Sequence, residues 1–244
     1  MKIGILGAGN IGKQLANKLA AAGHDVKVAH SRLPEEIPAE AVETGARATT
    51  SGDAMTDIDV AILSMPYTAY EDVKPLIASL PDEVVVIDTA NYFPNRDVVI
   101  PEIEAGEVES VWVQNLLGRP VTKAWNTIFM MSLRERGRPG GDPQRVAGPV
   151  SGDRVRDREV AIALMDDTGF DGFDAGSLSE SWRQQPSAPV YCTDLTYDEV
   201  GPALASAERE RLPRRRELTA AVFAERQDQW TAESVARIHR ALNM

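Results

Sequence analysis

Apolar residues in the first part of the chain fall into short runs separated by helical patterns. Four runs of strand length follow one another: residues 2–6, 25–29, 59–63 and 84–87. The second differs from the others, because its β-branched residues Val26 and Val28 stand at alternate positions. Continuous apolar runs of this length are typical of strands buried on both faces of a parallel sheet. After the first run, Ile11, Leu15 and Leu19 recur at helical spacing until Gly23 ends the helix. The alternation predicts an α/β protein with a doubly wound, mostly parallel sheet.

The later elements are less regular. A brief edge strand is expected at residues 46–48, and a helix begins at Pro66 and runs toward Leu80. Further strands are predicted at residues 120–127, 145–153 and 170–175, and further helices at 111–117 and 158–168. Glycine, proline and charged residues predict surface loops at 95–106 and 134–143.

The turn after the first strand carries three glycines in the sequence GAGNIG, residues 7–12. Gly7 permits a tight turn, Gly9 removes a Cβ so that a pyrophosphate can approach the backbone, and Gly12 allows close packing of helix on strand. The unpaired N–H groups at the start of the helix favour a phosphate. This context of strand, glycine turn and helix predicts a Rossmann-type dinucleotide site.

The end of the second strand indicates which dinucleotide is bound. Sites that prefer NAD usually place an acidic residue about twenty positions after the fingerprint, whereas an arginine accommodates the 2′-phosphate of NADP. Here the strand is followed by Ser31 and Arg32, a hydroxyl donor beside a guanidinium. We therefore expect NADP, although Glu35 and Glu36 could instead hold Arg32 in a surface ion pair.

Polar groups also follow two of the buried strands. Ser64, Met65, Pro66 and Tyr67 come after the third run, and the fourth run leads into Asp88 and residues 89–91. Ligands of open parallel sheets lie beyond the carboxyl ends of the strands, so both segments are expected to face the cofactor. Asp88 is interpreted as a buried structural acid rather than a catalyst. The cofactor contacts expected from the second segment are Thr89, Ala90 and Asn91.

The chain changes in character at Leu178. Prolines and long polar side chains mark residues 180–192, and helical patterns follow from Glu199 onward. We therefore expect an NADP-binding Rossmann domain at residues 1–177 and a C-terminal helical extension at 178–244. Apolar stripes between Leu218 and Leu242 must be buried either on the main domain or on a second subunit, so a homodimer is one of two open arrangements.

Composition limits the kinds of partner and site that the protein can have. A formal net charge of -11 opposes binding to nucleic acid or to an anionic membrane surface. Cys192 is the single cysteine, so no intramolecular disulfide can form, and one cysteine with three scattered histidines does not give metal-ligand spacing. No apolar run approaches the ~20 residues of a membrane span and no signal peptide precedes the first strand, so we expect a cytoplasmic protein.

Several motifs together resemble the NADPH-dependent coenzyme F-420 reductase family. They are GAGNIG, the Ser31-Arg32 pair, SMPY at 64–67, KAWNT at 123–127, VSGD at 150–153 and GFDGFDAGSL at 169–178. The resemblance covers about the first 180 residues, in the same order. It implies that Ala8, Gly9, Asn10 and Ile11 hold the pyrophosphate and that Ser31 and Arg32 hold the 2′-phosphate. It also implies nicotinamide contacts from Ser64, Met65 and Pro66, and from Ala124, Asn126 and Thr127.

The chain departs from this family in two places. Its glycine turn is shorter than the family's GGTGN, and more than 60 residues follow Ser177. The segment SWRQQPSAPVYC, residues 181–192, replaces much of what would line the deazaflavin pocket of the family. Together with Tyr67, its residues Trp182, Gln185 and Tyr191 are therefore expected to line the acceptor pocket.

The predicted function is an NADP(H)-dependent oxidoreductase that transfers a hydride between nicotinamide and a deazaflavin or flavin-like acceptor. Such a transfer needs stacking and exclusion of water but no obligatory protein acid. A small carbonyl or imine is the alternative acceptor; it would need a proton donor, for which the candidates are Tyr67, Tyr92, Lys123 and Tyr191. A non-catalytic NADP sensor is the alternative from another class. An open apolar pocket beside the nicotinamide would argue against a sensor.

Overall fold

The computed structural model of the protein describes residues 1–30, 33–94, 96–226 and 230–244. Within these ranges eight strands form one sheet, in the order β3-β2-β1-β4-β5-β6-β7-β8. The strands are β1 (Lys2–Leu6), β2 (Asp25–Ala29), β3 (Arg47–Thr49), β4 (Val60–Leu63), β5 (Val85–Asp88), β6 (Thr122–Lys123), β7 (Ala147–Gly152) and β8 (Asp171–Asp174). Neighbouring strands are parallel except β6 and β7, which pair antiparallel. The predicted doubly wound, mostly parallel sheet is confirmed.

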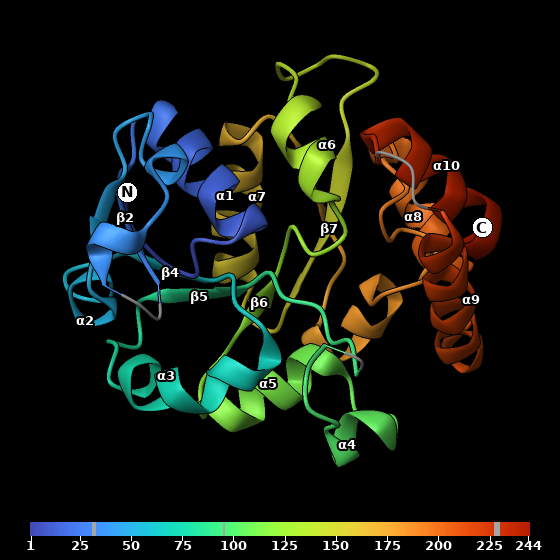
Figure 1. The fold of residues 1–244 in the computed structure, drawn as a ribbon, viewed down its shortest axis with the longest axis horizontal. Coiled ribbons are helices and arrows are strands. Elements are labelled where there is room, and N and C mark those ends of the chain that lie inside the picture. The colour runs from blue at the N-terminus through green and yellow to red at the C-terminus, as the bar shows by residue number, and fades with distance from the viewer. Residues whose placement is uncertain (31–32, 95, 227–229) are drawn as a thin grey trace.

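Helices cover both faces of the sheet (Figure 1). On one face lie α1 (Asn10–Ala21) and α7 (Val155–Asp167), whose apolar side chains pack with Ile3 and Ile5 of β1. On the other lie α3 (Tyr70–Ala78) and α5 (Glu109–Leu117), which pack with Leu63 and Val86. The strands are apolar on both faces because both faces are covered.

The remaining helices are short or lie in the C-terminal part. The short α-helices are α2 (Ser51–Ala54), α4 (Pro101–Glu104) and α6 (Met130–Glu135), and the C-terminal ones are α8 (Tyr197–Ala205), α9 (Leu212–Glu225) and α10 (Ala232–Asn243). Turns of 3-10 helix occupy Pro34–Glu36, Ala39–Ala41, Tyr67–Ala69, Leu178–Gln184 and Arg209–Arg211. No helix in the described part of the chain is both long and apolar enough to cross a membrane.

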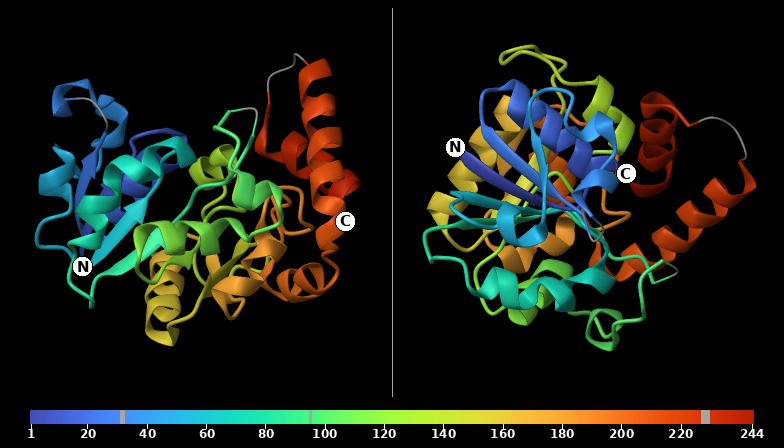
Figure 2. Two further views of the ribbon diagram at one scale, coloured as in Figure 1. Left: turned by 90° about the horizontal axis from the view of Figure 1, so that it is seen from below. Right: turned by 60° about the vertical axis from the view of Figure 1, so that its left-hand side comes forward.

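The C-terminal helices gather on the side of the molecule where β7 lies (Figures 1 and 2). Val190, Leu195 and Val200 form a third apolar cluster with Trp182. The apolar stripe of α10 is partly buried within the chain, since Val235 is 1% exposed, whereas Leu218 of α9 is 42% exposed. The division at residues 177 and 178 and the homodimer both stay predictions.

Three sequence-based expectations were wrong in detail. The segment 95–106 contains α4, and the predicted loop at 134–143 begins within α6. The strand expected at 120–127 is paired only at Thr122–Lys123, because the chain turns away from the sheet. Trp125 has a φ of 57°, in the left-handed region that extended strands do not use. Residues 124–127 therefore lie over the end of the sheet instead of within it.

Candidate functional site

The three glycines of the first turn are needed for different reasons. A Cβ on Gly7 would lie 2.0 Å from the carbonyl oxygen of Ser64, and one on Gly12 would lie 1.8 Å from the carbonyl oxygen of Gly7. The packing of the protein itself therefore excludes side chains at both positions. Gly9 has a φ of -75°, which any residue adopts. No described atom lies within 4 Å of the Cβ that it lacks, so its missing side chain leaves space free outside the protein.

That free space lies at the start of helix α1. The helix begins at Asn10, and in the described chain no side chain caps it and no acidic residue occupies its first turn. Its first N–H groups and the positive end of its dipole are therefore available to an anion. A helix end of this kind, beside a glycine without a side chain, fits the pyrophosphate of a dinucleotide.

A cavity of about 450 Å³ opens from this helix end. It lies where β1, β4, β5 and β6 end, at the point where strand order reverses, which is the ligand position in open α/β sheets. Many of the residues predicted from the sequence line it: Gly9, Asn10, Ile11, Ser64, Met65, Pro66, Thr89, Ala90, Asn91, Asn126 and Tyr191. The structure thus brings the glycine turn, two strand ends and the C-terminal segment to one place.

Other predicted residues lie elsewhere. Gly7, Ala8 and Gly12 form the turn behind the cavity, and Ala124 and Thr127 are buried beside it. Tyr67 is buried against the rings of Tyr70, Tyr92 and Trp112. Trp182 packs between Arg183 and Arg209, and the side chain of Gln185 hydrogen-bonds Glu109. Ser31 and Arg32 lie outside the described residues.

Sequence reasoning missed most of the apolar wall of the cavity. Its apolar members are Phe93, Trp125, Ile128, Phe129, Met130 and Cys192, and Arg96 lies at the same wall. The run of apolar residues that directly follows the KAWNT turn was the available signal. The cavity therefore has two halves. The glycine turn forms the nucleotide half, and the apolar wall forms the other half.

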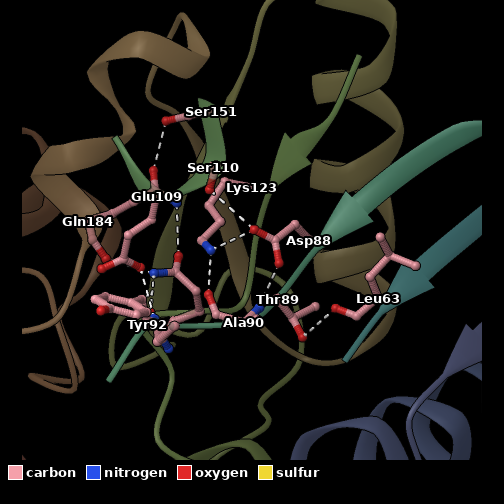
Figure 3. A network of polar contacts seen from close by, with 12 residues as sticks. Leu63, Asp88, Thr89, Ala90, Tyr92, Glu109, Ser110, Lys123, Ser151 and Gln184 are labelled. Carbon is pink, nitrogen blue, oxygen red and sulfur yellow. Dashed lines mark hydrogen bonds and ion pairs between the residues drawn. The ribbon is translucent and has the colours of Figure 1, made fainter. Parts of the chain in front are cut away.

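A buried ion pair supports the floor of the cavity (Figure 3). The ammonium of Lys123 lies 2.7 Å from Asp88 Oδ2 and also donates to the carbonyl oxygen of Ala90. Asp88 accepts further hydrogen bonds from Tyr70 Oη at 2.6 Å and Ser110 Oγ at 3.2 Å. Asp88 is thus the structural acid that the sequence indicated, and Lys123 is held beneath the cavity.

A chain of amides joins three distant segments next to this ion pair. Asn126 Nδ2 donates to Asn91 Oδ1 at 3.0 Å and to the Gln184 carbonyl oxygen at 2.7 Å. Gln184 Nε2 donates to Asn126 Oδ1 at 2.9 Å, and Ser151 Oγ donates to Gln184 Oε1 at 2.7 Å. Each amide is fixed by its partners, so the side chain of Asn91 faces the cavity in one orientation.

The structure distinguishes the four candidate proton donors by whether their side chains are buried or line the cavity. Lys123 is 1% exposed and paired with Asp88, and Tyr67 is 2% exposed. Tyr92 is fully buried, and its hydroxyl accepts a hydrogen bond from the backbone N–H of Ile100. Of the four, all within the described ranges, Tyr191 alone lines the cavity. No group of three or more histidine, cysteine or acidic side chains in the described chain could hold a metal ion.

A protein-family model matches the first part of the chain. Residues 2–92 match the family model described as NADP oxidoreductase coenzyme F420-dependent. The matched segment includes the glycine turn and the ends of β4 and β5, and it ends before the apolar wall of the cavity. The family resemblance is confirmed for the motifs within residues 2–92, and an NADP-dependent oxidoreductase is supported with its acceptor left open. The motifs at residues 123–127, 150–153 and 169–178 lie outside the match.

A curated protein and a solved structure also resemble parts of the chain. The chain is 48% identical over 56 residues to the Escherichia coli (strain K12) protein YjhV, and this match spans 23% of the chain and 41% of the length of that relative. Among solved structures, the hypothetical protein SMa0349 from Sinorhizobium meliloti has a TM-score of 0.65 and 25% identity, covering 80% of this chain and 95% of that one.

A second solved structure shares the fold at lower identity. It is a protein of Arthrobacter sp. FB24 described as an F420-dependent NADP-reductase, with a TM-score of 0.58 and 19% identity. The superposition covers 74% of this chain and 87% of that one. At this identity the likeness shows the fold alone.

Proposed function

We propose that this chain, whose residues 2–92 belong to the coenzyme F-420-dependent NADP oxidoreductase family, transfers a hydride between NADP(H) and an acceptor bound in the same cavity. The observation that carries this proposal is the two-sided cavity. One side is the uncapped start of α1 beside Gly9, and the other is an apolar wall that includes Trp125 and Phe129. A cavity with this lining can hold a nicotinamide and an acceptor in contact while excluding water.

Each part of NADP has a proposed set of contacts. Backbone groups of Ala8 to Ile11 would hold the pyrophosphate, and Ser31 and Arg32 the 2′-phosphate. The residues proposed to contact the nicotinamide are Ser64, Met65, Pro66, Thr89, Ala90, Asn91, Ala124, Asn126 and Thr127. All of them line the cavity except Ala124 and Thr127, which are buried beside it. When bound, NADPH would supply the hydride, and the protein would supply orientation and the apolar wall.

A deazaflavin or flavin-like compound is the first acceptor to test, because the family match names coenzyme F-420. The apolar wall of the cavity suits a flat ring system stacked against the nicotinamide. A small carbonyl or imine is the second candidate, and the observation that favours it is the Tyr191 side chain in the cavity lining.

A non-catalytic sensor is less well supported. It would need residues 181–192 to block the place of the nicotinamide, but Trp182 packs in the C-terminal apolar cluster and Gln184 is buried behind Asn126 of the lining. The same segment brings Tyr191 to the wall without filling the cavity.

The first experiment measures NADPH binding by calorimetry and then anaerobic NADPH oxidation with coenzyme F-420, FMN or FAD, beside a control without acceptor. Turnover with the deazaflavin alone would support the family reaction. Binding without turnover of any of these compounds would remove the flavin-like class. A protein that does not bind NADPH would contradict the whole proposal.

The cellular location and the oligomeric state also stay proposals. We propose a cytoplasmic protein and test the homodimer by sedimentation, since part of the apolar stripe on α9 is exposed at Leu218.

A further inference from the structure

The acceptor side of the cavity is built from residues outside the family match. That match ends at residue 92, whereas the apolar wall comes from residues 93–130 and from Tyr191 and Cys192. The matched segment covers the nucleotide side and therefore carries the expectation of NADP. The chemical class of the acceptor has to be inferred from the residues of the wall itself.

Tyr191 is the group on this wall that can give up a proton. The other apolar members of the wall carry no ionisable group except Cys192, whose pKa is raised by burial first and by the nearby Asp194. Arg96 also lines the cavity, but its guanidinium is paired with the buried Asp97 and donates to the carbonyl oxygen of Asn91. Arginine does not release its proton in proteins.

The backbone around Tyr191 is held in one conformation. Cys192 N donates to the Thr127 carbonyl oxygen at 2.8 Å, and Arg240 of α10 donates to the carbonyl oxygens of Thr193 at 2.7 Å and Asp194 at 2.9 Å. Ser187, Cys192 and Asp194 have φ values of 71°, 54° and 48°, in the left-handed region that L-residues seldom adopt. Left-handed residues that persist in this way cluster at functional sites.

The C-terminal helices also fix the tyrosine ring. The Tyr191 ring lies edge-on to the ring of His239 from α10, with centroids 5.4 Å apart. His239 in turn packs on Phe223 of α9 and shares a hydrogen bond of 3.0 Å with Asn243. The helices after residue 205 thus hold Tyr191 from behind, which gives this part of the chain a role in the site.

We propose that Tyr191 is the catalytic proton donor of this cavity and that the acceptor is a small compound with a C=O or C=N double bond. This inference rests on the proposed function and selects the second of its two acceptor classes. A hydride transfer to a deazaflavin requires no protein acid, whereas hydride addition to a neutral carbonyl or imine does. A fixed tyrosine on the acceptor wall is the feature that distinguishes the two.

The acceptor would receive a hydride from NADPH and a proton from Tyr191. The acceptor carbon receives a hydride, with its two electrons, from NADPH, which leaves as NADP⁺. The π electron pair of the double bond moves to the oxygen or nitrogen, which forms a bond to the proton of the Tyr191 hydroxyl. The product is an alcohol or an amine, and the tyrosinate regains a proton from solvent.

The surroundings of Tyr191 keep its proton in place until that step. Burial, first, and then Cys192 and Glu109 raise the pKa of Tyr191 well above its usual range. The phenol is therefore neutral at physiological pH and can donate a hydrogen bond to the acceptor. The oxygen or nitrogen anion that hydride addition would leave is far more basic than a phenolate, so the proton transfer remains favourable.

The test compares Tyr191→Phe with Tyr197→Phe, a control on the exposed face of α8 where the side chain is 49% exposed. Benzaldehyde and 2-methyl-1-pyrroline serve as carbonyl and imine, and NADPH oxidation is followed with each. We expect Tyr191→Phe to lower kcat by about a hundredfold or more, as for loss of a general acid. Tyr197→Phe should match the wild-type protein, and NADPH affinity should be unchanged in both variants.

A binding measurement adds a result that does not depend on turnover. Benzamide, an unreactive carbonyl compound, is titrated calorimetrically into the wild-type protein and both variants. Loss of one hydrogen bond should weaken benzamide binding roughly 3- to 10-fold in Tyr191→Phe only.

Three outcomes would overturn the assignment. They are equal rates in Tyr191→Phe and wild type, equal benzamide affinities in the two, or a wild-type protein that reduces coenzyme F-420 but neither test compound. In each case NADPH would still bind and the proposed oxidoreductase would stand. Absence of NADPH binding, by contrast, would remove the proposed function itself.

Discussion

The two sides of the cavity are built in different ways. The nucleotide side consists of the ends of regular elements: the turn from β1 into α1 and the carboxyl ends of β4 and β5. The acceptor side consists of irregular backbone at residues 124–130 and 185–195, held by hydrogen bonds to distant segments. A side built from strand ends follows from the fold itself, whereas the other depends on a particular set of tertiary contacts. The acceptor side can therefore differ between proteins that share the fold.

The largest expected effect lies at the ion pair beneath both sides. Lys123→Met leaves the fully buried Asp88 without its counter-charge. Removing one partner of a buried pair typically costs about 3–5 kcal/mol, so the free energy of unfolding should fall by that amount. Urea denaturation measures the change. The matched control is Lys2→Met, which removes an exposed ion pair with Asp57 and should leave the free energy of unfolding nearly unchanged.

Acid should affect the acceptor side before the nucleotide side. Burial lowers the pKa of His239 from 6.5 to about 4, so the unfolded chain binds a proton more readily than the folded one between these values. Stability is therefore full above pH 6.5 and falls as the pH drops toward 4, by about 3 kcal/mol for this group.

The measurement is the free energy of unfolding as a function of pH in the wild-type protein and in His239→Phe. The variant should lose most of the slope between pH 6.5 and 4. A slope that persists unchanged would mean that other groups cause it. Hydrogen exchange should show opening of residues 185–195 ahead of β1 as the pH falls.

A side chain at Gly9 should separate binding from folding. Gly9→Val fills the space above the start of α1 without meeting any described atom of the protein. We expect NADPH affinity to fall by about a hundredfold, or about 2.7 kcal/mol, while the free energy of unfolding changes by less than about 1 kcal/mol. The contrasting variant Gly12→Val should destabilise the fold, because its Cβ would overlap the Gly7 carbonyl oxygen. Unchanged affinity in Gly9→Val would remove the pyrophosphate assignment.

The smallest expected effect concerns the choice of dinucleotide. Arg32→Ala should weaken NADPH binding by about tenfold, or 1.4 kcal/mol, and leave NADH binding nearly unchanged. Calorimetric titration of both dinucleotides checks this. An equal loss for NADPH and NADH would contradict a role for Arg32 at the 2′-phosphate. The variant Arg47→Ala, which removes an arginine of β3 paired with Asp25, serves as a control for charge alone.

The nucleotide side could be predicted because its signals are local. The apolar runs at 59–63 and 84–87 have the length and composition of buried strands, and Gly7 and Gly12 stand where backbone crowding requires glycine. Strand ends in a parallel sheet meet at one edge, so Ser64 and Asn91 could be placed together without knowing any tertiary contact.

The acceptor side could not be predicted in the same way. Trp125 lines the cavity because its backbone turns into a left-handed conformation, which the sequence KAWNT does not reveal. Trp182 was expected in the pocket together with Tyr191, yet the structure places it between two arginines in the C-terminal cluster. The two residues are nine positions apart in one irregular segment, and tertiary contacts such as the hydrogen bonds of Gln184 and Cys192 decide which of them faces the cavity.

The position of Trp125 gives the protein an optical probe of its own. Trp125 belongs to the cavity lining, and its buried indole donates a hydrogen bond from Nε1 to Thr168 Oγ1 at 3.2 Å, so its orientation is fixed. Reduced nicotinamide absorbs in the region where tryptophan emits, whereas the oxidised form does not. Excitation energy should therefore pass from Trp125 to NADPH but not to NADP⁺. The fluorescence of the unlabelled protein would then report the redox state of its nucleotide in real time.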